Sequence, residues 1–179
     1  HRPVAQLMMH AKQTLWRSPE RRVAPMDPEG CHACGPTCPA LRLFDLDADD
    51  IPDKTRDIIK VVVASRYDEN KIGVGLVHGL SLDEGAIGCS ISHDSHNIIA
   101  AGTNDEDIIA TISEVIRAGG GMAAVSGDEM RSIPLSCAGL MSDKPYETVS
   151  RELDELNRFV AEQGAVENPF MYLSFLALT

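Results

Sequence analysis

The sequence predicts an α+β domain in which a mixed β-sheet of about five or more strands packs against two main helices. Three observations support this class. Apolar and β-branched residues recur with strand-like spacing between residues 57 and 102. Two later segments repeat apolar residues every three to four positions, as amphipathic helices do. A short strand-like segment separates these helices, and a final apolar segment follows them.

Four strands are expected before the first helix. Residues 58–64 read IIKVVVA, and this β-branched run is typical of a buried strand. A polar turn at residues 67–71 leads to the second strand. The remaining strands are expected at residues 72–79, 85–92 and 98–102, with a fifth at 122–126 after the first helix.

The first helix begins after Thr103 or Asn104, either of which can cap it. Acidic residues fill its first turn, where the helix dipole favours negative charge. A glycine of the run at residues 119–121 ends it in the left-handed conformation. Its apolar face consists of Ile108, Ile109, Ile112, Val115 and Ile116.

The second helix starts after Ser142 and Asp143, with Pro145 near its first position. It ends by Gly164. A single apolar stripe indicates that one face of this helix is buried. The stripe consists of Val149, Leu153, Leu156 and Val160.

Length and charge limit the possible partners of the chain. We assign residues 53–179 to the α+β domain and leave residues 1–52 as an unassigned N-terminal segment. The net charge of −11 argues against binding along a nucleic-acid backbone. No apolar run is long enough for a membrane span. We therefore expect a soluble, cytoplasmic protein that contacts neither nucleic acid nor membrane.

The two ends of the chain are unusual. It starts at His1 without an initiator Met and stops at Thr179 inside an apolar stretch. Because natural termini are more often polar, we expect a piece of a longer polypeptide.

The cysteines fall into two groups. Cys31, Cys34 and Cys38 have the spacing C-x2-C-x3-C, which is that of half a zinc or iron–sulfur knuckle. A closed site needs a fourth ligand, and no second C-x-x-C or H-x3-H follows. The cluster is therefore either a metal site, of zinc or iron–sulfur, or a group of reduced cysteines on a loop. Cys89 and Cys137 are expected to be buried, inert thiols.

The densest group of polar side chains lies at residues 90–97, after a strand of small residues. Its two imidazoles converge only if the chain turns at Asp94 and Ser95, which favour turns. Such a turn would suit proton transfer or hydrogen bonding to a polar heterocycle, or it would simply join two strands. The candidate catalytic residues are His93, Asp94 and His96, and the candidate substrate-binding residues are Ser92, Ser95 and Asn97.

Several motifs, in order over two thirds of the chain, resemble the C-terminal domain of bacterial adenine deaminase of the amidohydrolase type. The resemblance covers residues 57–179 and leaves the Cys cluster outside. The motifs are VVV at 61–63, Arg66-Tyr67, GLVHG at 75–79, GAI at 85–87, SHDSHNII at 92–99, GTND at 102–105, GGG at 119–121, IPL at 133–135, AGLMS at 138–142 and NPFM at 168–171.

The resemblance implies hydrolytic deamination of adenine to hypoxanthine and ammonia, in purine salvage or catabolism. In that family a (β/α)8 barrel holds a divalent metal, manganese or iron, on ligands that begin with an H-x-H pair. This chain has no H-x-H and is too short for a barrel of about 250 residues. The resemblance therefore implies that the metal lies outside this chain, that the isolated chain is inactive, and that its partners are its own barrel domain and further copies in a homo-oligomer.

Two roles remain open for residues 57–179. The turn at residues 93–97 could pack over the barrel mouth and exclude water from the purine. Alternatively, the domain could stabilise the enzyme or its oligomer without touching substrate. A third hypothesis makes the chain a non-catalytic assembly or binding module, ordered by a metal at Cys31, Cys34 and Cys38.

Overall fold

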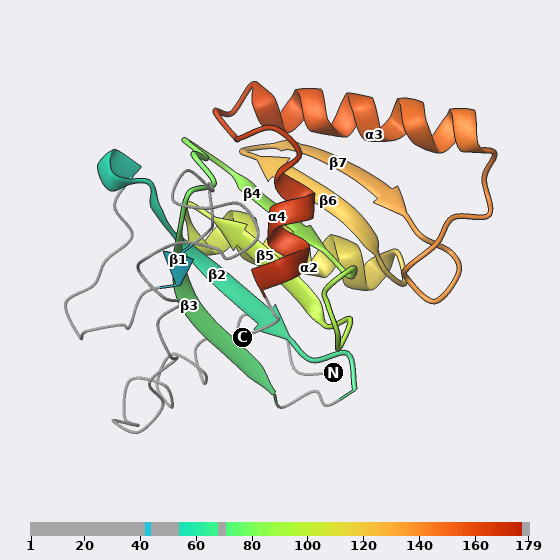
Figure 1. Cartoon of the computed structure of the whole chain (residues 1–179), viewed down its shortest axis with the longest axis horizontal. Helices are drawn as coiled ribbons and strands as arrows, with labels where there is room; N and C mark the ends of the chain where they lie inside the picture. Colours follow the sequence, from blue (N-terminus) through green and yellow to red (C-terminus); the bar gives the residue numbers. More distant parts are fainter. Residues whose placement is uncertain (1–41, 44–53, 68–70, 177–179) are drawn as a thin grey trace, which may run out of the picture.

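The computed structural model describes residues 42–43, 54–67 and 71–176 (Figure 1). Within this part of the chain, one β-sheet contains seven strands in the order β1-β3-β2-β5-β4-β6-β7. Every neighbouring pair of strands is antiparallel. The strands are β1 (Arg42–Leu43), β2 (Ile58–Ala64), β3 (Ile72–His78), β4 (Ala86–Cys89), β5 (Ile98–Gly102), β6 (Gly121–Ser126) and β7 (Glu129–Pro134).

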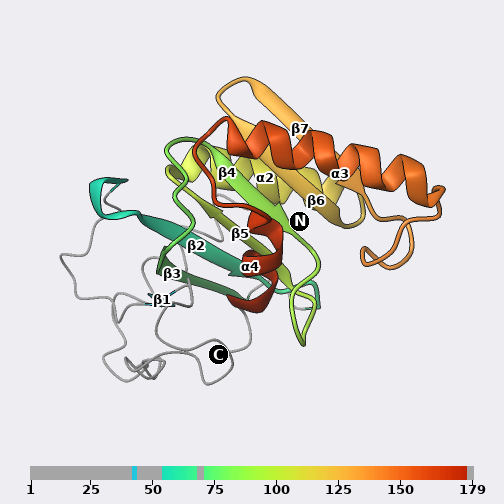
Figure 2. The ribbon, with the colours of Figure 1, turned by 45° about the horizontal axis from the view of Figure 1, so that its top comes forward.

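Helices cover both faces of the sheet (Figures 1 and 2). Helix α2 (Asp105–Arg117) lies on one face, and α3 (Tyr146–Ala161) and α4 (Pro169–Phe175) lie on the other. A 3-10 turn, η1 (Lys54–Arg56), precedes β2. None of the helices in the described part combines the length and apolar character needed to cross a bilayer.

The predicted α+β class is confirmed, and the five predicted strands and two predicted helices are present. The expected mixed sheet is wrong in one respect, since no described strands form a parallel pair. The helical crossover α2 does connect two strands of the same direction, β5 and β6. However, β4 lies between β5 and β6 and pairs antiparallel with both. The two parallel strands are therefore not hydrogen-bonded to each other.

The core consists of two apolar layers, one on each face of the sheet. Successive residues of a strand point to opposite faces, so Ala86 packs toward α2 while Ile87 packs toward α3 and α4. The α2 layer contains Val62, Ala100, Ile108, Ile112 and Val115, and the larger layer contains Ile59, Val77, Ile87, Ile99, Leu156, Val160 and Leu173, among others.

The ends of α2 follow the sequence prediction. Asn104 is its N-cap, and the Asn104 side-chain oxygen accepts a hydrogen bond from the Asp107 N–H at 2.8 Å. At the other end the helix stops at Arg117, and Gly119 has a φ of 76°. That left-handed conformation is the one in which helices commonly end on glycine.

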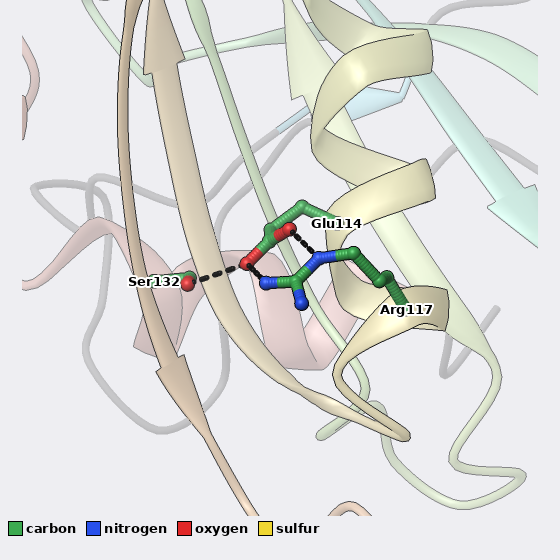
Figure 3. A network of polar contacts seen from close by, with 3 residues as sticks. All are labelled: Glu114, Arg117 and Ser132. Carbon is green, nitrogen blue, oxygen red and sulfur yellow. Dashed lines mark hydrogen bonds and ion pairs between the residues drawn. The ribbon is translucent and has the colours of Figure 1, made fainter.

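A buried acid ties α2 to the edge strand β7 (Figure 3). The Glu114 side chain is only 7% exposed. Arg117 donates from Nε and Nη2 to its two carboxylate oxygens at 2.7 Å each, and Ser132 Oγ donates to Oε1 at 2.7 Å. The hydrogen bonds from Arg117 outweigh the effect of burial and lower the pKa of Glu114 below its ordinary value.

In the Glu114→Gln variant, the free energy of unfolding is expected to fall less between neutral and acid pH than it does in the parent chain. With a lowered folded-state pKa, Glu114 stabilises the fold fully above the ordinary Glu pKa of about 4.3, and this contribution disappears as the pH falls through the lowered value. Because Gln does not ionise, the variant should lose about 1–3 kcal/mol at pH 7 and almost nothing in strong acid. Urea unfolding of the full chain across this pH range measures the difference. An equal loss at every pH would contradict the expectation, and Asp154→Asn on the exposed face of α3 is the control.

Candidate functional site

The candidate site lies on the connection between β4 and β5. The predicted third strand, residues 85–92, is too long, because β4 ends at Cys89. Beyond it the Ser90 N–H donates to the Gly121 carbonyl at 2.9 Å, and the His93 N–H donates to the carbonyl of Ser174 in α4 at 2.9 Å. The Ser90 bond continues the pairing of β4 with β6 by one residue, and the chain leaves the sheet by His93, whose N–H bonds to α4 instead.

The turn expected at Asp94 and Ser95 is present, with turn geometry at residues 93–95. It brings the ring centroids of His93 and His96 to 6.1 Å from each other. Both rings are partly buried, whereas Asp94 and Ser95 are exposed at the tip. We call residues 93–97 the 93–97 loop.

Helix α4 packs against the 93–97 loop. The His93 ring stacks on Phe175, with centroids 4.9 Å apart and an interplanar angle of 26°. Phe175 is 51% exposed, and its helix neighbour Met171 is 61% exposed. An accessible aromatic and apolar surface therefore lies beside the imidazoles.

Two polar atoms of this region point inward. The Ser92 side chain is fully buried, and its Oγ has no hydrogen-bond partner among the described residues. His96 Nδ1 is also buried without a partner in that part of the chain. Asn97 donates from Nδ2 to Ser95 Oγ at 2.9 Å. Of the predicted substrate-binding residues, Ser95 and Asn97 are accessible, whereas Ser92 lies beneath the surface.

Sequence reasoning gave no functional role to Arg66, which follows β2 and contacts the 93–97 loop. The Arg66 backbone N–H donates to Asn97 Oδ1 at 3.3 Å. Its guanidinium donates from Nη1 to the His96 carbonyl at 3.4 Å and from Nη2 to the Ala138 carbonyl at 2.8 Å. The sequence pointed to Arg66 only through the Arg66-Tyr67 motif, one of those that resemble the adenine deaminase C-terminal domain.

The two lone cysteines differ from each other. Cys89 is buried, its thiol donates to the Ile91 carbonyl at 3.1 Å, and burial raises its pKa to about 12, so the prediction of an inert thiol is confirmed. Cys137 is exposed, so its predicted burial is wrong. It lies on a surface turn closed by a bridge to Met141. Cys31, Cys34 and Cys38 lie outside the described residues.

The comparison with known families decides the assignment. The family model described as "Adenine deaminase C-terminal domain" matches residues 42–179. The chain belongs to this adenine deaminase C-terminal domain family. The match includes the seven strands and α2, α3 and α4 of the part that the structure describes.

Relatives of the adenine deaminase C-terminal domain give the same result. The chain is 57% identical to an adenine deaminase of Methanoculleus marisnigri over 136 residues, which are 76% of this chain and 26% of that protein. It is 54% identical to one of Methanoregula boonei (76% and 24%) and 49% identical to one of Bacillus licheniformis (71% and 23%). The chain therefore spans about a quarter of the length of the curated relatives it matches.

Proposed function

We propose that this domain works as the C-terminal part of an adenine deaminase and that its 93–97 loop faces the bound purine. The observation that carries this proposal is the pairing of His93 and His96, 6.1 Å apart, beside the exposed ring of Phe175. Family membership supports the substrate, because the relatives are named adenine deaminases.

The side chains of the loop suit this reaction. Adenine and water give hypoxanthine and ammonia, so protons must reach the departing nitrogen. Imidazoles transfer protons near neutral pH and donate or accept hydrogen bonds at ring nitrogens. His93 covers one face of the Phe175 ring, and the exposed remainder of the ring offers an apolar surface to a purine. Seated on the barrel mouth, the loop would also exclude water from the reaction.

The described residues do not fit the manganese or iron that the resemblance implies. Within residues 54–67 and 71–176, no three His, Cys, Asp or Glu side chains lie together where they could hold a metal ion. In this proposal the remainder of the complete enzyme holds the metal and the barrel. Zinc at the Cys cluster, the homo-oligomer and the cytoplasmic location stay predictions.

The test is turnover of a complete enzyme that carries this domain. Such an enzyme can be made by exchanging the domain into the Methanoculleus marisnigri relative, which is 57% identical over the aligned region. His93→Ala and His96→Ala should each lower kcat for ammonia release about a hundredfold, the low end of the range for general acid–base groups. The melting temperature should stay within a few degrees of the parent.

His78→Gln is the matched control, because His78 is exposed at the end of β3 far from the loop. If His93→Ala and His96→Ala keep full turnover but melt earlier, the domain only stabilises the enzyme. The isolated 179-residue chain, with manganese, iron or zinc added, should release no ammonia from adenine. Turnover by that purified chain would show that these residues hold a complete site and would contradict the proposal.

A further inference from the structure

Two loops meet at the end of the sheet that carries the histidines. One is the 93–97 loop. The other follows β7, and we call residues 135–141 the 135–141 loop. Arg66 is the side chain that bonds to both, donating to the carbonyls of His96 and Ala138. These carbonyls lie 30 and 72 residues from Arg66 in the chain.

The chemistry of Arg66 suits this bridging position. A guanidinium presents several N–H donors in a rigid plane, so one side chain can hold two carbonyls in a fixed relation. In the part of the chain that the structure describes, no carboxylate forms an ion pair with Arg66. Its donors are therefore directed at loop backbone rather than at an acidic side chain.

The 135–141 loop is itself fixed to the sheet. The buried Ser90 accepts a hydrogen bond from the Gly121 N–H at 2.8 Å and donates from Oγ to the Gly139 carbonyl at 2.5 Å. Gly120 and Gly139 touch backbone to backbone, since a Cβ built on Gly120 would lie 2.3 Å from Gly139 Cα. The 135–141 loop is thus held in place by the sheet, and Arg66 links it to the carbonyl of His96.

We propose that Arg66 is a positioning residue, which sets the His96 imidazole against the substrate by holding the 93–97 loop to the 135–141 loop. The inference rests on the proposed function, because it assumes that the 93–97 loop faces the purine. Arg66 itself does not touch the reacting atoms. Displacement of a positioned group by about 1 Å can lower turnover about a hundredfold.

The first experiment measures steady-state kinetics of the complete enzyme carrying this domain. Arg66→Ala should lower kcat about ten- to a hundredfold, with a much smaller change in KM. Arg66→Lys should recover part of the loss, because an ammonium reaches one carbonyl but not both in the same geometry. Millimolar guanidinium should restore turnover to Arg66→Ala and leave His96→Ala unchanged. Arg151→Ala, on the exposed face of α3, should match the parent.

The second experiment measures hydrogen exchange in the full 179-residue chain and needs no activity. The His96 N–H donates to the Ser92 carbonyl at 2.6 Å, and the Gly139 N–H donates to the Leu135 carbonyl at 3.0 Å. In Arg66→Ala both amides should exchange about tenfold faster, whereas amides of β4 and β5 should keep their rates. A uniform increase across the sheet would overturn the proposal, because it would make Arg66 a general stabiliser.

The outcomes separate this inference from the proposed function. If His96→Ala loses turnover while Arg66→Ala keeps it, the loop faces substrate and the role of Arg66 is refuted. If neither variant loses turnover, the proposed function itself fails. If Arg66→Ala loses turnover together with melting temperature and guanidinium restores nothing, its role is only structural and the inference is overturned. Loss of kcat with rescue, at an unchanged melting temperature, supports it.

Discussion

Gly120→Ala is expected to lower the free energy of unfolding by about 3 kcal/mol or more. Gly120 has a φ of 117°, a conformation that L side chains rarely adopt. A methyl group there would lie 2.3 Å from Gly139 Cα and 3.0 Å from Ser90 Oγ. Since the nearer obstacle is backbone, no rotamer change can remove the clash. Backbone strain and overpacking each cost about 1–3 kcal/mol, and here both apply.

The neighbouring residue provides a matched control. Gly119 also has a positive φ, 76°, but a Cβ built on it meets nothing within 4 Å. Gly119→Ala should therefore lose only about 1–2 kcal/mol, the cost of placing a side chain in the left-handed region. Urea unfolding of the two variants in the full chain measures the difference. Equal losses would mean that the contact between Gly120 and Gly139 does not constrain the fold.

Local sequence patterns were sufficient to predict most strands of the sheet and the helices α2 and α3. The β-branched run at residues 58–64 and the cap at Asn104 act through neighbouring residues, so a single sequence reveals them. Strand β7 was missed because only Ile133 of its six residues is buried. An exposed edge strand lacks the apolar alternation that identifies a strand. The turn at Gly127 and Asp128, between β6 and β7, was the available signal.

The candidate site was predictable only in its local part. The turn at Asp94 and Ser95 follows from the residues that form it. In contrast, the departure of the chain from the sheet involves a long-range bond, from the His93 N–H to the Ser174 carbonyl in α4. Phe175 and Arg66 join the histidines through tertiary contacts that no spacing rule encodes. The final apolar segment is too short for a helical repeat of apolar residues to be recognised, so the sequence did not distinguish the seven-residue helix α4 from a loop.

Leu173→Ala is expected to lower the free energy of unfolding by about 3–5 kcal/mol, which is typical of truncating a fully buried leucine. Leu173 has no exposed surface and packs into the larger apolar layer. Met171, two residues earlier on the same helix, is 61% exposed. Met171→Ala should change stability by less than about 0.5 kcal/mol. Chemical unfolding of both variants in the full chain gives the comparison.

Loss of packing at Leu173 should also affect the 93–97 loop, because α4 contacts that loop. The residues directly after Leu173 hold the loop, since the Ser174 carbonyl accepts from the His93 N–H and the Phe175 ring stacks on the His93 ring. Loosening α4 should therefore speed hydrogen exchange at the His93 amide in Leu173→Ala before the sheet opens, and Met171→Ala should leave that rate unchanged. If His93 exchanged at the parent rate in Leu173→Ala, the loop would keep its shape without α4. The 93–97 loop would then be held by its other contacts, which include those of Arg66 to Asn97 and His96.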